Sequence, residues 1–216
     1  MPDNSIVIPV RDEAENIAPL LDEIEQAVSG RYSIEAVLVD DGSVDATADA
    51  LRDAMRRYSW VRAVQHSEPC GKSGALRTGI VRAHAPVIVT IDGDLQNIPS
   101  DIPGLIEAMR GSSPASPVGL VCGQRRNRQD PWLKKVASRV ANSVRGAILR
   151  DGARDTGCGL MVFSRDAFLG LPYFDNIHRF LPALMIREGH RVVFVDVGHR
   201  PRLKGRSKYG AKRPKK

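Results

Sequence analysis

The sequence predicts a single α/β domain in which a mostly parallel, twisted sheet carries helices on both faces. Two observations lead to this fold class. Short, continuously apolar segments alternate along the chain with longer segments of helical period. The apolar segments also lack the polar alternation of a strand with one face in water, so helices should cover both sides of the sheet. A chain of 216 residues with 42% hydrophobic residues suits one such domain.

The first half of the chain contains the most regular part of this pattern. Short apolar runs predict strands at 5–10, 34–39, 61–65 and 87–91. Apolar residues with a helical period predict helices at 13–28, from 45 or 47 to about 58, and at 73–84. Asp45 or Thr47 can cap the second of these helices.

The second half is less regular. A loop rich in Gly, Ser and Pro is expected at 111–117, and strands are expected at 118–122, 160–163 and 191–197. Between them, residues 132–149 form an amphipathic helical pattern with Lys and Arg on its polar side. This helix either packs on the core with its charged side in water or lies on a membrane surface, and the sequence leaves both open.

Charge is distributed unevenly along the chain, which has a net charge of +7. Residues 1–109 hold 18 acidic and 9 basic residues, whereas residues 110–154 hold 10 basic and 2 acidic ones. The last 17 residues hold 9 basic and no acidic residues. Nucleic acid, an anionic membrane surface or an anionic substrate could each pair with these basic segments. We therefore divide the chain into a domain at 1–199 and a basic tail at 200–216.

The cysteines and the apolar runs bear on location. Cys70, Cys122 and Cys158 are odd in number and lack the spacing of a metal site, so a disulfide framework is not expected. No apolar run is long enough to cross a membrane, and no secretory signal opens the sequence. These features are typical of a protein in the reducing cytoplasm.

The residues after the strand at 87–91 predict a metal site. If Asp92, Asp94 and Gln96 continue in an extended conformation, their spacing of two places them on one side. Carboxylate and amide oxygens suit Mg²⁺ or Mn²⁺, and the phosphates of a substrate usually complete such a site.

Two further strands end in charged residues. Arg11 and Glu13 follow the first strand, and Asp40 and Asp41 follow the second. The carboxyl ends of parallel strands meet at one edge of a sheet, where ligands bind. Carboxylates gathered there repel one another, so we expect a cation or an electropositive ligand edge between them.

Ordered motifs give the chain a resemblance to the family 2 glycosyltransferases. It is most similar to their polyprenyl-phosphate branch, which includes dolichol-phosphate mannosyltransferase and bacterial enzymes that glycosylate undecaprenyl phosphate. The resemblance extends from about residue 5 to 210 and implies a GT-A, Rossmann-like fold. The motifs, in order, are Ile8-Pro9-Val10-Arg11-Asp12-Glu13-Ala14-Glu15-Asn16, Val39-Asp40-Asp41-Gly42-Ser43, Gly71-Lys72-Ser73-Gly74, Asp92-Gly93-Asp94-Leu95-Gln96, Gly123-Gln124-Arg125, Asp155-Thr156-Gly157-Cys158-Gly159 and Gly205-Arg206-Ser207-Lys208-Tyr209-Gly210.

The resemblance also implies roles for residues. A metal would lie on Asp92, Asp94 and Gln96, and Asp41 would accept a hydrogen bond from the base. Arg11 stands where the family often has an aromatic residue, although a guanidinium plane can also stack. The nucleotide sugar would be bound by Pro9, Arg11, Glu13, Asp41, Lys72, Asp92 and Gly93. The acceptor phosphate would be bound by Arg125, Arg139, Arg206 and Lys208. Catalysis would involve Asp94, Arg125, Arg139 and Asp155, of which Asp155 is either a base, an orienting group or a turn residue.

The chemistry of sugar transfer favours one kind of acceptor. A divalent cation offsets the charge that grows on the leaving diphosphate. A hydroxyl acceptor needs a base, whereas a lipid phosphate is already an anion and needs cations to position it. The basic segments supply such cations. We therefore expect metal-dependent transfer of mannose or a related hexose from a GDP- or UDP-sugar to a dolichyl or undecaprenyl phosphate, with inversion implied by the resemblance.

The expected location is the inner face of the cytoplasmic membrane. The chain would dock there through its basic helix and tail, through a membrane-anchoring subunit or as a homo-oligomer. Two alternatives stay open: a family 2 glycosyltransferase acting on a saccharide hydroxyl, and a non-enzymatic basic binding protein. Nucleic acid is not an expected partner, because the tail lacks interleaved aromatic residues except Tyr209.

Overall fold

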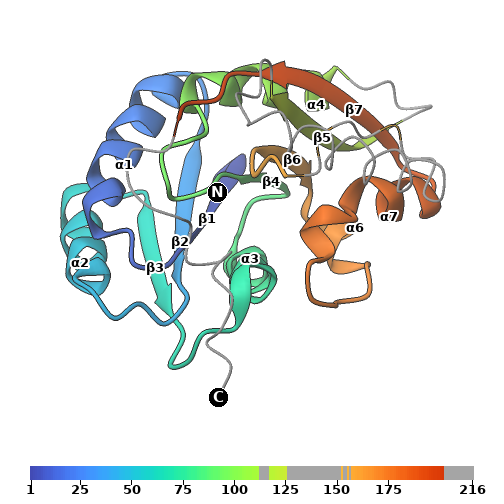
Figure 1. Ribbon diagram of the computed structural model, residues 1–216. Coiled ribbons are helices and arrows are strands. Elements are labelled where there is room, and N and C mark those ends of the chain that lie inside the picture. Colours follow the sequence, from blue (N-terminus) through green and yellow to red (C-terminus); the bar gives the residue numbers. More distant parts are fainter. Residues whose placement is uncertain (112–116, 126–151, 153–154, 156, 202–216) are drawn as a thin grey trace.

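A computed structural model describes residues 1–111, 117–125, 152, 155 and 157–201 of the chain. These residues form one seven-stranded sheet in the order β3-β2-β1-β4-β6-β5-β7 (Figure 1). The strands are β1 (Asn4–Val10), β2 (Ile34–Asp40), β3 (Val61–Gln65), β4 (Val87–Thr90), β5 (Val118–Arg125), β6 (Met161–Ser164) and β7 (Arg191–Val197).

The strand directions place most carboxyl ends at one edge of the sheet. β1 pairs in parallel with β2 and β4, and β2 pairs in parallel with β3. β6 is antiparallel to both β4 and β5, while β5 and β7 are parallel. All strands except β6 therefore run in the same direction, which confirms the predicted mostly parallel sheet.

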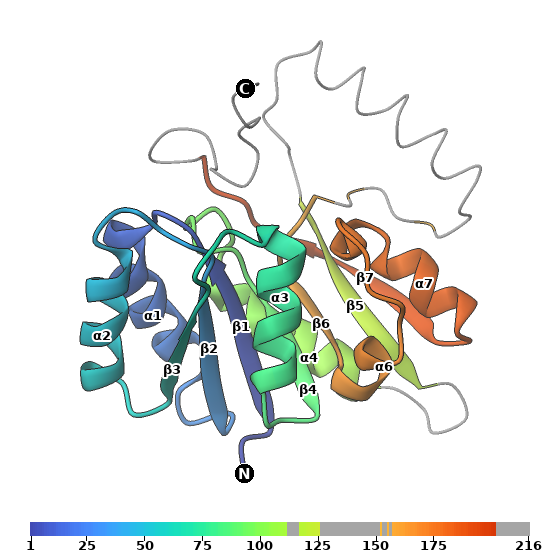
Figure 2. The same ribbon diagram turned by 90° about the horizontal axis from the view of Figure 1, so that it is seen from below.

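Helices cover both faces of the sheet, as the sequence predicted (Figures 1 and 2). One face carries α1 (Ala14–Val28), α2 (Thr47–Arg57) and α4 (Ile102–Arg110), whose buried side chains share a core with Ile8 and Leu38. The other face carries α3 (Gly71–Arg82), α6 (Arg165–Leu169) and α7 (Leu181–Arg187), which pack around Phe163. Two short 3-10 helices, η1 (Pro99–Asp101) and η2 (Ile177–Arg179), precede α4 and α7.

The elements predicted from the first half of the chain are confirmed within a few residues. The strand predicted at 118–122 extends to Arg125, and α4, α6 and α7 were not predicted. The basic helix expected at 132–149 and residues 202–216 of the tail lie outside the described residues. Within the described part of the chain, every helix is too short or too polar to cross a membrane.

Candidate functional site

The candidate site lies at the edge of the sheet where the parallel strands end, which we call the rim. It consists of the segments at the carboxyl ends of β1, β2, β3, β4, β5 and β7, at 11–13, 40–43, 66–72, 91–97, 124–125 and 198–200. The register of the sheet brings these segments together from positions up to about 190 residues apart. The rim thus contains most of the residues singled out from the sequence.

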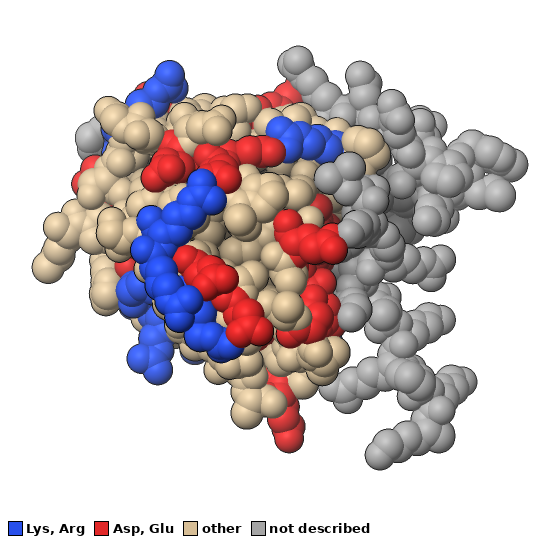
Figure 3. Space-filling view, turned by 90° about the vertical axis from the view of Figure 1, so that its left-hand side faces the viewer, with Lys and Arg blue, Asp and Glu red and all other residues tan. Residues whose placement is uncertain are grey.

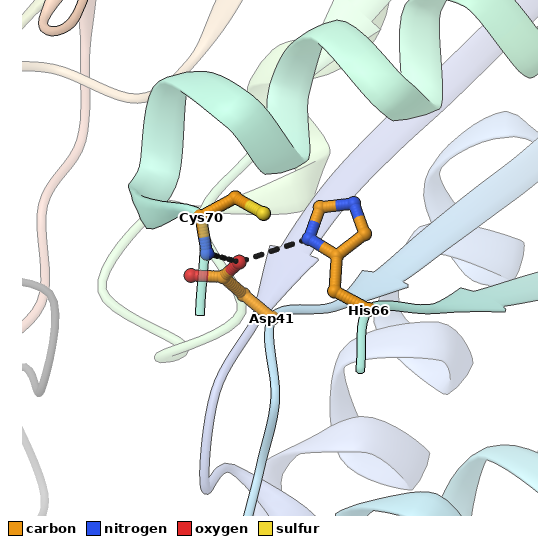
Figure 4. A group of neighbouring side chains, drawn as sticks. All are labelled: Asp41, His66 and Cys70. Carbon is orange, nitrogen blue, oxygen red and sulfur yellow. Dashed lines mark hydrogen bonds and ion pairs between the residues drawn. The ribbon is translucent and has the colours of Figure 1, made fainter. Parts of the chain in front are cut away.

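Asp41, after β2, is completely buried and bonded within the protein. Its Oδ1 accepts the backbone N–H of Cys70 at 2.7 Å, and its Oδ2 accepts that of Gly71 at 2.9 Å. The Nδ1 of His66 lies 2.9 Å from Oδ1 (Figure 4). The Nε2 of His66 in turn lies 2.9 Å from the hydroxyl of Thr78. This network fixes the start of α3 against the end of β2.

Asp41, His66 and Cys70 also offer three ligand atoms within 4.8 Å of one another, close enough to share a metal ion. Hydrogen bonds already occupy both carboxylate oxygens of Asp41 and both ring nitrogens of His66. An ion there would have to replace part of this network. We therefore interpret the cluster as the anchor of α3 and look for a metal elsewhere on the rim.

Asp92, after β4, is more accessible and lies beside a cation. Its side chain is 27% exposed, and its Oδ1 is 2.5 Å from the Nζ of Lys72. A Cβ added to Gly159 would overlap the Asp92 carboxyl group, so any other residue at 159 would displace that carboxylate. The structure thus brings together two residues that were predicted to bind the nucleotide sugar.

The segment after β4 corrects the reasoning that predicted the metal site. Residues 91–97 do not continue in an extended conformation: the chain turns, and Leu95 has a φ of 60°. The backbone N–H of Gln96 donates to Asp94 at 3.2 Å, and that of Asp92 donates to the side chain of Asn97 at 3.4 Å. The predicted alternation of side chains is therefore wrong, and hydrogen bonds within a turn hold the acidic residues at the rim instead.

His199, just after β7, is a rim residue that sequence reasoning missed. The Nδ1 of His199 is buried and has no hydrogen-bond partner among the described residues. Its Nε2 is 3.4 Å from the side-chain nitrogen of Gln96. Burial and the charge of Arg125 lower the pKa of His199, while Asp94 and Asp155 oppose that shift.

The donor set of the rim fits a divalent cation. Asp92 and Asp94 offer carboxylate oxygens and Gln96 offers an amide oxygen, and the His199 ring lies beside Gln96. Oxygen ligands with at most one imidazole suit Mg²⁺ and Mn²⁺. In sequence, the only signal for His199 was its place directly after a strand of the sheet.

Arg125, the last residue of β5, forms a two-pronged ion pair with Asp155. Its Nε is 2.5 Å from Oδ2 and its Nη2 is 2.8 Å from Oδ1, and the two side chains are only 12% and 11% exposed. The Oδ1 of Asp155 also accepts the backbone N–H of Gly157 at 3.0 Å. Of the roles left open for Asp155, the geometry favours the orienting group and the turn residue over the base.

The comparison with protein-family models identifies the family of this chain. Residues 5–170 match the model described as glycosyl transferase family 2. The chain belongs to glycosyltransferase family 2.

Several relatives of this glycosyltransferase family member carry names that specify a lipid acceptor. The dodecaprenyl-phosphate galacturonate synthase of Rhizobium johnstonii is 34% identical over 214 residues, which cover 97% of this chain. The undecaprenyl-phosphate 4-deoxy-4-formamido-L-arabinose transferase of Aeromonas hydrophila is 34% identical over 211 residues, which cover 95% of this chain. In both cases the chain spans 62% of the length of the relative.

Solved structures support the GT-A fold of this family member. Glucosyl-3-phosphoglycerate synthase from Mycobacterium tuberculosis, in complex with Mn²⁺, UDP and glucosyl-3-phosphoglycerate, superposes with a TM-score of 0.73 at 21% identity. The match covers 93% of this chain and 73% of that one. A mannosyltransferase from Pyrobaculum calidifontis, in complex with GDP-mannose and Mn²⁺, has a TM-score of 0.68 at 23% identity, over 95% and 58% of the two chains.

The other residues that the family resemblance pointed to lie at the rim or outside the described residues. Pro9 is buried in β1, and the Nε of Arg11 is buried without a hydrogen-bond partner among the described residues. Glu13 accepts a 2.6 Å hydrogen bond from the side chain of Asn16. A Cβ at Gly93 would overlap Val10. Arg139, Arg206 and Lys208 lie outside the described residues.

The start of α3 in this family member is also bonded to the segment before α7. The hydroxyl of Ser73 accepts the backbone N–H of Asn176 at 2.9 Å and lies 2.9 Å from the Nδ1 of His178. The serine proton can therefore be donated to His178, which must then be neutral. Burial and the neighbouring charge of Lys72 lower the pKa of His178 to about 4, which keeps the ring neutral at physiological pH. Sequence reasoning missed this contact.

Proposed function

We propose that the chain transfers a sugar from a nucleotide sugar to a polyprenyl phosphate, with inversion at the anomeric carbon. One observation carries the proposal: a single rim holds the carboxylates of Asp92 and Asp94 and, at the end of β5, a guanidinium group oriented by Asp155. The two parts suit the two anions of this reaction, a leaving diphosphate and an attacking phosphate. The named relatives act on polyprenyl phosphates, which supports the same acceptor class.

The acidic part of the rim would handle the donor. Asp92, Asp94 and Gln96 would hold Mg²⁺ or Mn²⁺, which offsets charge on the leaving diphosphate when it is bound. Lys72, which contacts Asp92, would supply a second positive charge to the same phosphates. Pro9, Arg11, Glu13, Asp41 and Gly93 would complete the nucleotide-sugar pocket, although Asp41 already has three donors within the protein.

The basic part would handle the acceptor. Arg125 presents a planar group of donors, which suits the oxygens of a phosphate. Because Asp155 holds this group with two hydrogen bonds, Arg125 keeps its orientation without an acceptor present. An ionised phosphate needs no base, and the pairing of Asp155 with Arg125 agrees with that requirement. Arg139, Arg206 and Lys208 would add positive charge around the acceptor.

The remaining parts of the proposal concern place and substrate. The domain at 1–199 would carry the catalytic rim, and the tail at 200–216 would lie near the membrane and the acceptor. The enzyme would work on the cytoplasmic face of the membrane, docked peripherally, held by an anchoring subunit or assembled as an oligomer. The donor would be a GDP- or UDP-sugar carrying mannose or another hexose derivative; the relatives named above act with galacturonate and a formamido-arabinose.

A binding screen followed by a transfer assay tests the proposal. Thermal shifts of the chain would be measured with GDP, UDP and their sugars, each with and without Mn²⁺. The best donor would then be incubated with polyprenyl phosphate in detergent, and labelled sugar would be counted in the lipid fraction. Metal-dependent transfer into lipid is the expected result. Transfer into an oligosaccharide alone, or nucleotide binding with no transfer from any donor, would contradict it.

Arg125→Lys separates the acceptor side from the donor side. Lysine keeps the charge but cannot form the two-pronged pair with Asp155. We expect the rate of transfer to fall about 10–100-fold, a loss of about 1.4–2.8 kcal/mol of transition-state stabilisation, while the Kd for nucleotide with Mn²⁺ stays the same. Titration calorimetry and the transfer assay measure the two quantities. A weaker nucleotide Kd with unchanged turnover would move Arg125 to the donor side.

A further inference from the structure

Exposed aromatic side chains are concentrated on one side of the rim. Among the described residues, the segment between β6 and β7 contains Tyr173, Phe174 and Phe180, which are 43%, 38% and 37% exposed. The rings of Phe174 and Phe180 contact each other with centroids 5.8 Å apart. Large apolar side chains left in water at adjacent positions indicate a surface that is covered in use.

Arginines lie among these rings. The guanidinium carbon of Arg77, on α3, is 5.2 Å from the centroid of the Tyr173 ring. Arg179 is exposed and directly precedes Phe180. We call Arg77, Tyr173, Phe174, Arg179 and Phe180 the aromatic–arginine surface.

Hydrogen bonds hold this surface next to the candidate site. Asn176 has a φ of 67°, which turns the chain so that its N–H reaches the Ser73 hydroxyl. Ser73 directly follows Lys72, whose Nζ contacts Asp92. A Cβ at Gly74 would lie 3.5 Å from the Tyr173 hydroxyl, so the ring packs against the first turn of α3. The aromatic–arginine surface is therefore a fixed border of the rim.

The opposite side of the molecule has a different composition. Figure 3 shows basic and acidic side chains next to one another on the side that carries α1 and α2. Arg56 pairs with Asp53 at 2.8 Å, and Arg57 pairs with Asp22 at 2.7 Å. Exposed charges that neutralise one another are typical of a surface that stays in water. Arg57 also contacts a ring on that side, but this ring belongs to Tyr58, which is only 4% exposed. The exposed rings among the described residues are those beside α3.

We propose that the aromatic–arginine surface docks the chain on the anionic surface of a phospholipid bilayer. Half-exposed aromatic rings settle at the interface between headgroups and acyl chains, and arginines attract anionic headgroups. The basic residues at 110–154 and 200–216, which give the chain its net charge of +7, would add attraction to the same partner. Docking here would place the rim at the height of a lipid phosphate. The choice of a membrane as the occupant rests on the proposed lipid acceptor, whereas the surface itself rests on the structure.

Vesicle flotation with the full chain tests this surface without any substrate. Vesicles of phosphatidylcholine with phosphatidylglycerol would be used at about 0.1 M and about 0.5 M salt, because high salt screens the basic segments but not the insertion of rings. We expect the double variant Phe174→Ser/Phe180→Ser to bind about tenfold less than the unchanged chain at the higher salt. The matched control Val44→Ser/Met55→Ser removes two exposed apolar side chains elsewhere and should bind like the unchanged chain.

A second measurement keeps the test decisive if the double variant does not fold. Phe174→Trp places an indole on the surface, and its emission should shift to the blue when anionic vesicles are added, relative to the unchanged chain with Trp60 and Trp132. Equal vesicle binding by the double variant and no shift for Phe174→Trp would overturn the proposal. The proposal would also be overturned if the unchanged chain bound no vesicles but formed a dimer that the double variant does not form. The surface would then be assigned to a second copy of the chain.

The two proposals fail separately in these experiments. Lost vesicle binding with normal transfer to detergent-dispersed polyprenyl phosphate supports the docking surface and leaves the reaction intact. If vesicle binding depends on Phe174 and Phe180 but the unchanged chain transfers no sugar, the docking surface is supported and the proposed function is contradicted.

Discussion

Two acidic strand ends on the same rim differ in what surrounds their carboxylates. Asp40 and Asp41, after β2, are fully buried. Asp40 accepts the backbone N–H of Ser43 at 2.9 Å and the side chain of Gln65 at 3.1 Å, and Asp41 accepts two backbone N–H groups of its own. Their negative charge is thus offset by donors within the protein.

Asp92, after β4, is offset by the side chain of Lys72 instead of by backbone N–H groups, and Asp94 lies in the turn that follows it. Asp92 lies against the mobile charge of Lys72 and remains partly exposed, and Asp94 accepts the N–H of Gln96. A carboxylate that is offset by a flexible lysine can exchange that partner for a metal ion, whereas one offset by rigid amides cannot do so without rearranging the backbone. The first pair therefore suits structure and the second suits ligand binding.

The largest expected effect is on activity, from Asp94→Asn. The amide keeps the shape of the side chain but removes the charge that would hold a cation, so we expect transfer to fall about 100–1000-fold. The free energy of unfolding should change by about 0.5 kcal/mol or less, because the amide oxygen of asparagine can still accept the N–H of Gln96. Transfer assays and urea unfolding measure the two effects. The control is Asp53→Asn on α2, which should change neither.

Full activity of Asp94→Asn would remove the metal assignment from this strand end. A large loss of stability in the same variant would break the comparison, because Asp94 would then be as structural as Asp41.

The second effect is on stability, from Asp41→Asn. In either orientation of the asparagine side chain, its NH₂ group faces the backbone N–H of Cys70 or of Gly71. That buried backbone N–H is then left without an acceptor. We expect the free energy of unfolding to fall by about 1–3 kcal/mol. Urea unfolding at neutral pH measures it, again against Asp53→Asn. If Asp41→Asn is as stable as the unchanged chain but no longer binds nucleotide, the base-recognition role outweighs the structural one.

The first half of the fold could be predicted because its elements are long enough to show a period. α1 and α3 have 15 and 12 residues, and the strands between the helices are mostly apolar. α6 and α7 have only 5 and 7 residues, fewer than two full turns of helix each. Their packing against Phe163, rather than any repeat in the sequence, positions them.

The sequence predicted which residue types lie at the candidate site and where in the fold they lie. It did not predict the hydrogen-bond partners of those residues. Aspartates at the ends of strands pointed to the rim, yet nothing in the sequence distinguishes Asp41 from Asp92. The difference comes from the backbone N–H groups of residues 70 and 71, which any residue except proline would supply. His199 meets Gln96 only because β7 ends beside the turn after β4, 103 residues away in the sequence. Such contacts depend on the register of the sheet.

The smallest expected effect is on stability and concerns Glu35, near the start of β2. Glu35 is a buried carboxylate whose Oε1 accepts the hydroxyl of Ser5 and the backbone N–H of His84, both at 2.6 Å. Arg62 lies 2.5 Å from its Oε2. Burial alone would raise the pKa of Glu35, but these three donors outweigh burial and lower it below its usual range. Like Asp41, Glu35 is thus offset by internal donors.

The sign of the pH dependence follows from that lowered pKa. Glu35 should contribute stability that is fully present above its unfolded pKa and is lost as the pH falls through the lower folded value. Glu35→Gln should therefore cost about 1 kcal/mol at pH 7 and progressively less toward pH 3, measured by urea unfolding along a pH series. Glu188→Gln, at an exposed position, is the control. A constant difference between Glu35→Gln and the unchanged chain at every pH would mean that shape, not charge, makes an internally bonded carboxylate structural.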